Sequence, residues 1–546
     1  MTSHDYIIVG GGAAGCVLAA RLSEDPGAQV LLLEAGPHRR SPLLQVPLAE
    51  VRWMGDPKYD WCYQTEQDPT IGDRRVVIPG GRLLGGSNAI NGMVFVRGQR
   101  EDYDGWAAAG NTGWSWDSVL PFFRRLERVH GDYGQTRGTL GPIDVGAPDE
   151  PDELCEAFLA AAAEAGYPSN PDYNSGDQAG FGYYQFMIRR GRRASAVAGY
   201  LEQARRRPNL TVQTGARVTK LQLQGTRCVG VRYRVQNQDH EATCRREVIL
   251  SAGTIQSPKL LELSGIGPVD VLARVGIPVV ADLPGVGENF RDHYAARLRW
   301  RVRHPITLNE RTRGRRLAGE VLQYAIARRG VLSRPIALGF GFVPARPDGT
   351  RPDLQFHFAA ASYGPGPNRV LDSKPGMTVG VYPLRPESRG SVHLRSADPT
   401  AAPVISPRFL DAEADQASLV AGMRIARRIV AGAALAQHRD VELVPGPDVR
   451  SDDELLAFAR EAGDTSYHPV GTCRMGTDPL AVVDPRLRVR GVQGLRVIDA
   501  SVMPTLVSGN TNAATFMIAE KGAEMVLADH AAGMSRTTAQ PTFAEG

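Results

Sequence analysis

His468 is the side chain in this sequence best suited to remove a proton at neutral pH. Histidine titrates near neutrality, so a positioned imidazole can take a proton from a reacting group. Here it precedes Pro469, which disfavours helix, and lies in a glycine-containing loop of the kind that often carries reactive side chains. The alternative is a structural histidine. We interpret the rival candidate among the eleven histidines, His293, in that structural way.

Asn512 is the polar side chain that we expect to assist this base. It stands where the turn at residues 508–512 enters a predicted helix over residues 513–528. Asparagine is a favoured helix N-cap, so a capping role alone is the alternative. Asn510 is a near neighbour of the same type, and the spacing to residues 518–520 favours Asn512.

The first 36 residues have the pattern of a strand, a helix and a second strand. Residues 6–9 predict a short apolar strand, and residues 13–23 predict a helix that begins with small side chains. Residues 30–33 predict another strand that is almost wholly apolar. Such strands belong to parallel sheets that are covered on both faces.

Three glycines follow the first strand in the spacing Gly10-x-Gly12-x-x-Gly15. In a dinucleotide site the first permits the tight turn, the second admits a pyrophosphate to the backbone, and the third lets helix and strand pack closely. The helix N-terminus then offers free N–H groups to the phosphates. Glu34 ends the next strand about 20 residues later, where a carboxylate accepts hydrogen bonds from a ribose. The pattern predicts dinucleotide binding, and by itself it does not separate FAD from NAD.

Further sheet strands are predicted in the middle of the chain and near its C-terminus. Residues 247–253 and 495–500 are apolar in the same way as the first strands. Between about residues 300 and 450 the pattern alternates instead, as at 353–358 and 391–394, which suits a sheet with one exposed face. We therefore predict an α/β protein: a discontinuous Rossmann-like nucleotide-binding domain with an inserted α+β substrate domain built on an antiparallel sheet.

The chain of 546 residues is too long for one small core. We assign the nucleotide-binding domain to residues 1–155, 205–300 and 455–530, and the substrate-binding domain to residues 156–204 and 301–454. Residues 531–546 are predicted to form a polar, poorly ordered tail.

Composition argues against several classes of partner. Charged residues make up 22% of the chain and the net charge is only +4, with no lysine–arginine tract, so we expect no nucleic-acid binding. The six cysteines are scattered without metal-ligand spacing, so we expect no metal site and a reduced compartment. No signal-peptide pattern and no stretch of about 18 apolar residues is present, which predicts a cytoplasmic protein without a transmembrane segment.

Two longer segments resemble signatures of the glucose-methanol-choline (GMC) oxidoreductases. Residues 81–93 (GRLLGGSNAINGM) look like the first signature of that family, and residues 253–267 (GTIQSPKLLELSGIG) are similar to the second. Segments 283–289, 468–472 and 499–512 also resemble the family, in its order. The matches span residues 5 to about 530, although residues 300–450 carry no motif that matches.

The resemblance implies FAD as the cofactor of the nucleotide-binding domain. It implies Val218 near the adenine and Asp499 and Ala500 near the pyrophosphate and ribityl chain. Some members attach the flavin through a histidine at a position that Ile90 occupies here, so we expect non-covalent FAD. The FAD-binding residues that we predict are Gly10, Gly12, Ala13, Ala14, Gly15, Glu34, Ala35, Arg82, Gly85, Gly86, Asn91, Gly92, Met93, Val94, Val218, Ala252, Gly253, Asp499, Ala500, Asn510, Thr511 and Asn512.

The activity that the resemblance implies is FAD-dependent oxidation of a primary alcohol to an aldehyde, with His468 as the base and Asn512 as its partner. The electron acceptor would be oxygen or another molecule. A hydroxynitrile lyase on the same scaffold is the alternative, since a few family members split cyanohydrins without redox turnover. Choline, aryl alcohols and hydroxymethylfurans are all compatible substrates.

Overall fold

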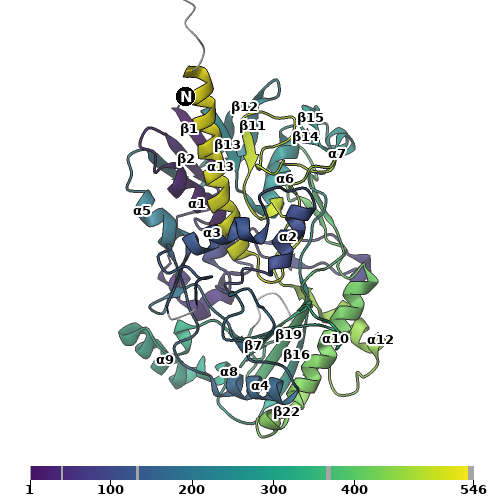
Figure 1. Cartoon of the computed structure of the whole chain (residues 1–546). Coiled ribbons are helices and arrows are strands. Elements are labelled where there is room, and N and C mark those ends of the chain that lie inside the picture. The colour runs from purple at the N-terminus through teal and green to yellow at the C-terminus, as the bar shows by residue number, and fades with distance from the viewer. Residues whose placement is uncertain (1, 39–40, 131–133, 365–369, 539–546) are drawn as a thin grey trace, which may run out of the picture.

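The computed structural model describes residues 2–38, 41–130, 134–364 and 370–538, and two seven-stranded sheets form its framework (Figure 1). In the first sheet β1 lies between β2 and β13, and all three are parallel. In spatial order its strands are β10 (Leu210–Thr214), β2 (Val30–Glu34), β1 (Thr2–Val9), β13 (Gln238–Leu250), β12 (Arg227–Val235) and β11 (Ala216–Gln224), with β24 (Leu495–Val497) also paired to β13. The predicted strands near both ends of the chain therefore share one sheet.

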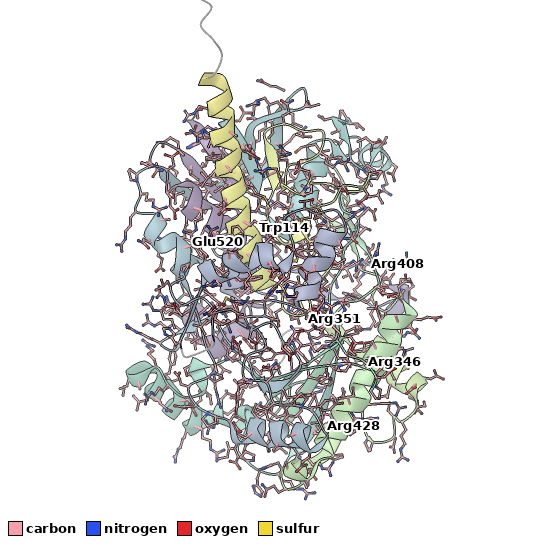
Figure 2. All side chains as sticks on the ribbon, viewed as in Figure 1. Trp114, Arg346, Arg351, Arg408, Arg428 and Glu520 are labelled. Atoms are coloured by element: carbon pink, nitrogen blue, oxygen red, sulfur yellow. The ribbon has the colours of Figure 1, made fainter. Side chains whose placement is uncertain are left out.

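Helix α1 (Ala13–Leu22) follows β1 directly, as predicted, and α13 (Asn512–Thr538) lies along it (Figure 1). Glu520 of α13, labelled in Figure 2, is fully buried and forms an ion pair with Arg21 of α1 over 2.8 Å. The hydroxyl of Tyr200 donates a hydrogen bond to the same carboxylate over 2.7 Å. These contacts fasten the C-terminal helix to the last turn of α1 and to the segment that contains Tyr200.

The second sheet is antiparallel, as predicted. In spatial order its strands are β22 (Arg439–Val444), β16 (Tyr294–Val302), β19 (Gly376–Pro383), β18 (Leu354–Ala359), β17 (Ala337–Val343) and β7 (Gly180–Tyr183), with β23 (Asp464–Thr465) also paired to β16. Helices α4 (Glu153–Glu164) and α10 (Glu413–Val430) cover one face, where Phe158 of α4 stacks on Phe358 of β18 at 4.4 Å. The alternating pattern predicted that the other face is exposed to solvent, but in its central strands this face lines a cavity.

Some predicted boundaries differ from the structure. Strand β16 and the short β23 belong to the second sheet, although residues 294–300 and 464–465 fall in segments assigned to the nucleotide-binding domain. The segment 391–394 does not join the second sheet, since β20 (Ser391–His393) pairs only with β21 (Val404–Ser406). Register with neighbouring strands decides sheet membership, and the alternating pattern does not carry that information.

Helix α13 runs on to Thr538, beyond its predicted end near residue 528. Residues 531–538 are thus helical where a tail is predicted, and residues 539–546 lie outside the described residues. Within the described ranges, no helix has both the length and the apolar character needed to cross a membrane.

Candidate active site

A deep cavity lies between the carboxyl ends of the parallel strands and the free face of the second sheet. Residues directly after β1, β2, β13 and β24 line one side, represented by Gly10, Ala35, Ala252 and Asp499. Ligands of open α/β sheets bind at this edge, because the loops that leave the strands there are free to surround them.

The glycine turn has the geometry that a dinucleotide needs. Gly10 adopts φ +102°, and a Cβ there would lie 2.5 Å from the carbonyl oxygen of Ser251. A Cβ on Gly15 would overlap the carbonyl oxygen of Gly10, so only glycine lets α1 pack this closely. At Gly12 the nearest atom to an added Cβ, the Cα of Gly86, is 4.0 Å away, and the residue lines the cavity. The turn is therefore closed on two sides and open where a pyrophosphate would approach.

Glu34 stands at the end of β2 with its carboxylate against the turn. Its Oε2 accepts a hydrogen bond from the N–H of Gly11 over 2.8 Å, and its Oε1 accepts one from the N–H of Gly36 over 2.7 Å. Burial raises the pKa of the Glu34 carboxyl to about 7. Each oxygen keeps a second lone pair, so the carboxylate can also accept a hydrogen bond from a ribose hydroxyl in the cavity.

Most of the predicted FAD-binding residues line this cavity. Those that do are Gly10, Gly12, Ala13, Ala14, Glu34, Ala35, Gly86, Asn91, Gly92, Met93, Val94, Val218, Ala252, Gly253, Asp499, Ala500, Asn510, Thr511 and Asn512.

Three predicted residues are outside the lining and contact residues next to it: Gly15, Arg82 and Gly85. Gly15 packs against the turn, and the Gly85 N–H donates to the carbonyl of Gly11 over 2.7 Å. Arg82 lies over the ring of Trp61, 5.2 Å from its centroid. These three residues lie outside the lining, and their contact with FAD stays a prediction.

Asp499 lines the cavity, and its carboxylate accepts four hydrogen bonds from the protein. Its Oδ2 accepts hydrogen bonds from the Gly253 N–H (2.9 Å) and the Ser257 hydroxyl (2.6 Å). Its Oδ1 accepts from the N–H and the hydroxyl of Ser501. The carboxylate thus ties the loop after β24 to the start of α6 (Gly253–Leu263), which leaves the backbone of this loop as the part free to face a ligand.

His468 lies at the wall of the same cavity and is 8% exposed. Its backbone N–H donates to Oδ1 of Asp292 over 2.8 Å, and its Nδ1 is 3.0 Å from Nδ1 of His293. Burial, together with the positive field of the neighbouring histidines and Arg297, holds the pKa of His468 well below its usual range. The imidazole is therefore neutral at physiological pH, which is the form that accepts a proton.

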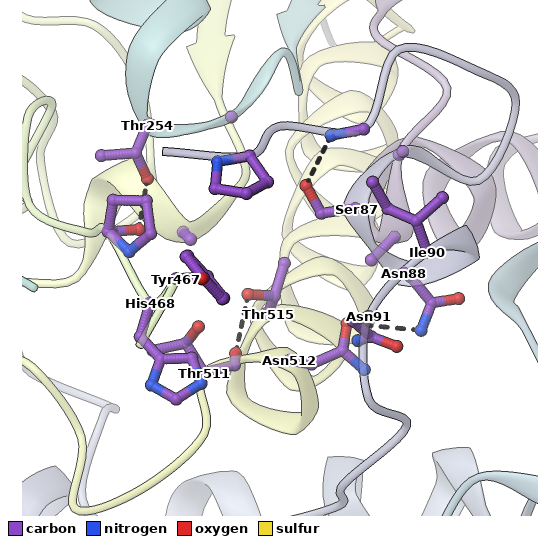
Figure 3. A pocket seen from close by; sticks show the side chains of 18 of the residues that line it. Ser87, Asn88, Ile90, Asn91, Thr254, Tyr467, His468, Thr511, Asn512 and Thr515 are labelled. Atoms are coloured by element: carbon purple, nitrogen blue, oxygen red, sulfur yellow. Dashed lines mark hydrogen bonds between the residues drawn. The ribbon is translucent and has the colours of Figure 1, made fainter. Parts of the chain in front are cut away.

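Asn510, and not Asn512, is the asparagine that contacts this histidine. The Asn510 Nδ2 lies 2.9 Å from Nε2 of His468. The Asn512 amide points elsewhere: its Nδ2 donates to the sulfur of Met187 over 3.3 Å, and its Oδ1 accepts from Asn88 (Figure 3). The contact with His468 favours Asn510 as its partner, whereas spacing and the family resemblance favoured Asn512.

The second sheet supplies a wall that the sequence did not reveal. The lining residues on its strands are Ala295, Arg297, Ala337, His357, Ala359, Thr378 and Gly380. Arg297 and His357 both pair with Gly380 in the strand register, so all three form one row across the sheet. The alternation of the predicted strand over residues 353–358 was the available signal, because it separates His357 from the neighbours that face the helices.

Three aromatic residues, Trp61, Tyr363 and Tyr467, line the cavity. Trp53 does not: it packs in a separate apolar cluster with Tyr59 and Ile90. The cavity therefore combines aromatic surface with one polar strand face.

Comparison with known proteins agrees with this geometry. Residues 4–295 and 386–519 match models of the N- and C-terminal parts of the GMC oxidoreductases, so the chain belongs to that family. It is 42% identical over 529 residues to the alcohol dehydrogenase [acceptor] of Pseudomonas putida, covering 96% of each chain. Mitochondrial choline dehydrogenase of Homo sapiens is 42% identical over 538 residues, covering 96% of this chain and 89% of the relative.

Among solved structures, a formate oxidase of Aspergillus oryzae studied for the modification of its FAD superposes with a TM-score of 0.91. The two are 28% identical, and the match covers 97% of this chain and 99% of the other. GMC oxidoreductases bind FAD, and the cavity described above has the glycine turn and the acidic strand end that this cofactor requires.

Proposed function

We propose that this protein oxidises a primary alcohol to an aldehyde with non-covalent FAD as its cofactor. One observation carries the proposal: Nε2 of a neutral, buried histidine, His468, is 2.9 Å from the amide of Asn510 in the cavity that also contains the glycine turn. Membership of the GMC oxidoreductases supports it. These similarities give the hydroxynitrile lyase alternative no support.

The protein's own residues perform the proton chemistry. An alcohol is a poor hydride donor until its hydroxyl proton leaves, and His468 takes that proton at Nε2. Asn510 donates an amide hydrogen to the substrate oxygen as negative charge develops on it. The N-terminus of α13, represented in the lining by Thr511 and Thr515, adds the positive end of a helix dipole. Bound FAD supplies the hydride acceptor.

The residues suited to hold FAD follow from their places in the cavity. Gly12 and the first turn of α1 suit the pyrophosphate, Glu34 a ribose, and Val218 the adenine. Ile90 lines the cavity with an apolar side chain, so the position that some family members use for a covalent bond offers no nucleophile here.

In this proposal one sheet binds the cofactor and the other contacts the substrate. The first sheet and its loops form the discontinuous FAD-binding domain, and the second sheet forms the substrate wall with Arg297, His357 and Thr378. The electron acceptor is oxygen or another small molecule. The cytoplasmic location stays a prediction.

Anaerobic mixing of the FAD-loaded protein with a panel of primary alcohols tests the reaction. Loss of the flavin's visible absorbance is the expected result, and His468→Ala should slow it by at least about 10²-fold because the base is gone. Cyanide release from a cyanohydrin without bleaching would favour the lyase instead. Acid denaturation should release all the FAD into the supernatant, and flavin retained on the precipitated chain would contradict the non-covalent assignment.

A further inference from the structure

One continuous chain of hydrogen bonds passes through the catalytic pair and ends on a backbone carbonyl at each side. From one end to the other, its members are the Leu384 carbonyl, His293, His468, Asn510, Gln355, Tyr184 and the Phe356 carbonyl. The side chains of His293, Gln355 and Tyr184 are fully buried. A carbonyl oxygen accepts hydrogen bonds and never donates them, so each end imposes a direction on the groups that follow it.

The end at Leu384 determines the histidine tautomers. His293 Nε2 lies 2.9 Å from the Leu384 carbonyl oxygen, so this nitrogen carries the hydrogen. Burial lowers the pKa of His293 to about 3, so the ring is neutral and its Nδ1 has only a lone pair. His468 Nδ1, 3.0 Å away, must therefore be the donor. A neutral His468 that carries its hydrogen on Nδ1 has its lone pair on Nε2.

The end at Phe356 determines the direction of the amides independently. The Tyr184 hydroxyl donates to the Phe356 carbonyl over 3.0 Å and accepts from Nε2 of Gln355 over 2.7 Å. The same Gln355 nitrogen donates to Oδ1 of Asn510 over 3.2 Å. Asn510 must therefore turn its NH₂ group toward His468.

The donor directions that the two carbonyls impose are compatible where Asn510 contacts His468. The amide offers a hydrogen where the imidazole offers a lone pair, 2.9 Å apart. Reversing either tautomer or amide would place two hydrogens or two lone pairs against each other at a buried contact, which costs the desolvation of both groups.

We propose that His293 and Gln355 are positioning residues that hold His468 in the tautomer with its lone pair on Nε2. Asn510 donates to that lone pair here, and the lone pair becomes free to take the substrate proton when the amide turns its hydrogen to the substrate oxygen. This inference rests on the proposed function, in which His468 is the base. It assigns a working role to His293, which the sequence led us to interpret as merely structural. Tyr184 completes the arrangement by orienting Gln355.

The same series of hydrogen bonds keeps the abstracted proton on His468. When the substrate O–H bond breaks, a new bond forms between the proton and Nε2, and the electron pair stays on the substrate oxygen. The Nδ1 hydrogen of His468 faces His293, whose other nitrogen already donates to a carbonyl that has no proton to exchange. The series of hydrogen bonds therefore ends at this carbonyl, and the proton cannot leave His468 along it toward the second sheet.

Nitrogen NMR of the FAD-loaded protein labelled with ¹⁵N-histidine tests the inference without any substrate. The signals of His468 are identified by their absence in His468→Ala. In the wild type we expect a protonated Nδ1 and an unprotonated Nε2. In His293→Phe and in Gln355→Met, each of which removes one side of the chain, we expect a mixture of tautomers and flavin reduction at least about tenfold slower.

Matched variants separate positioning from folding. His293→Gln offers both a donor and an acceptor, so it should retain more of the wild-type tautomer and rate than His293→Phe. His438→Phe is the control, because His438 is also a buried histidine that contacts a backbone carbonyl, that of His304, and it is not part of the cavity lining. Its substitution should leave the His468 signals unchanged, and FAD content reports whether each variant is folded.

The outcomes distinguish this inference from the proposed function. A wild-type His468 protonated at Nε2 would overturn the inference, as would tautomers that stay unchanged in both His293→Phe and Gln355→Met. A wild type with the expected tautomer whose flavin no alcohol reduces would contradict the proposed function and leave the positioning role intact.

Discussion

The amide nitrogen of Asn510 lies 2.9 Å from Nε2 of His468, whereas the amide of Asn512, two residues on, is turned toward Met187 and Asn88. This difference predicts unequal effects of two matched substitutions. Asn510→Ala should lower the rate of flavin reduction by about 10–10²-fold, because a donor to the developing alkoxide is lost. Asn512→Ala should have a clearly smaller effect. Single-turnover reduction by the best alcohol measures both, and the reverse order would return the role to Asn512.

Two glycines of the nucleotide turn should respond differently to the same methyl group. Gly15→Ala meets the Gly10 carbonyl, so we expect it to lower the free energy of unfolding by about 1–3 kcal/mol. Gly12→Ala points into open space, so the apoprotein should keep its stability while FAD affinity falls at least about tenfold. Urea unfolding of the apoproteins and titration with FAD separate the two effects. Normal FAD binding by Gly12→Ala would show that the pyrophosphate lies elsewhere.

Arg297 places a fixed positive charge in the wall that also contains His357. A cationic substrate beside it is disfavoured by like-charge repulsion in a partly desolvated site. We therefore expect choline to react with a kcat/KM at least about tenfold below that of 3,3-dimethylbutan-1-ol, a neutral alcohol of the same shape. Arg297→Met removes the charge, so the kcat/KM values for choline and for the neutral alcohol should become more similar. Preference of the wild type for choline would contradict the prediction and align this chain with its choline-oxidising relatives.

The raised pKa of Glu34 makes the stability of the apoprotein depend on pH. Its folded pKa of about 7 lies above the ordinary 4.5, so between these values the folded chain binds more protons than the unfolded chain. The contribution of Glu34 to the free energy of unfolding therefore falls as the pH rises from about 5 to 7, by up to about 1.4 kcal/mol per pH unit. Urea unfolding at several pH values should show a shallower decline for Glu34→Gln than for the wild type.

A surface carboxylate provides the control for that measurement. Hydrogen bonding to Arg395 lowers the pKa of Glu66, so this group is already ionised in both states above pH 5. Glu66→Gln should therefore leave the slope unchanged. Equal slopes for Glu34→Gln and the wild type would mean that Glu34 titrates normally.

Local patterns predicted the parts of the fold that local chemistry determines. The glycine spacing from Gly10 to Gly15 located β1, α1 and the turn between them. Steric constraints at Gly10 and Gly15 exclude a side chain, so the residue type itself marks these positions in the sequence. The choice between Asn510 and Asn512 could not be made in this way. Gly509 adopts φ +131° and packs against Val96, so a contact with a distant segment helps to determine which of the two side chains reaches His468.

The antiparallel sheet was predicted, but the residues with which it lines the cavity were not, for a related physical reason. Alternation in β18 correctly separates Phe356 and Phe358 from Gln355 and His357, but it does not reveal what covers each face. The second face meets a cavity instead of solvent, and that follows only from how the two sheets are placed. The contact of His293 with His468 could not be predicted, because it joins two loops far apart in sequence.

The pairing of β13 with both β1 and β24 has a consequence for how the protein is made. During synthesis the N-terminal strand emerges first, yet its neighbour β13 follows more than 200 residues later, and α13, which covers α1, comes last of all. Contacts between such distant segments form slowly, and unpaired strand edges attract other chains. The glycine turn must therefore wait for nearly the whole polypeptide before it acquires its final shape. We therefore expect the flavin to bind late in synthesis, since a chain that ends before residue 512 lacks α13, whose first residues line the cavity.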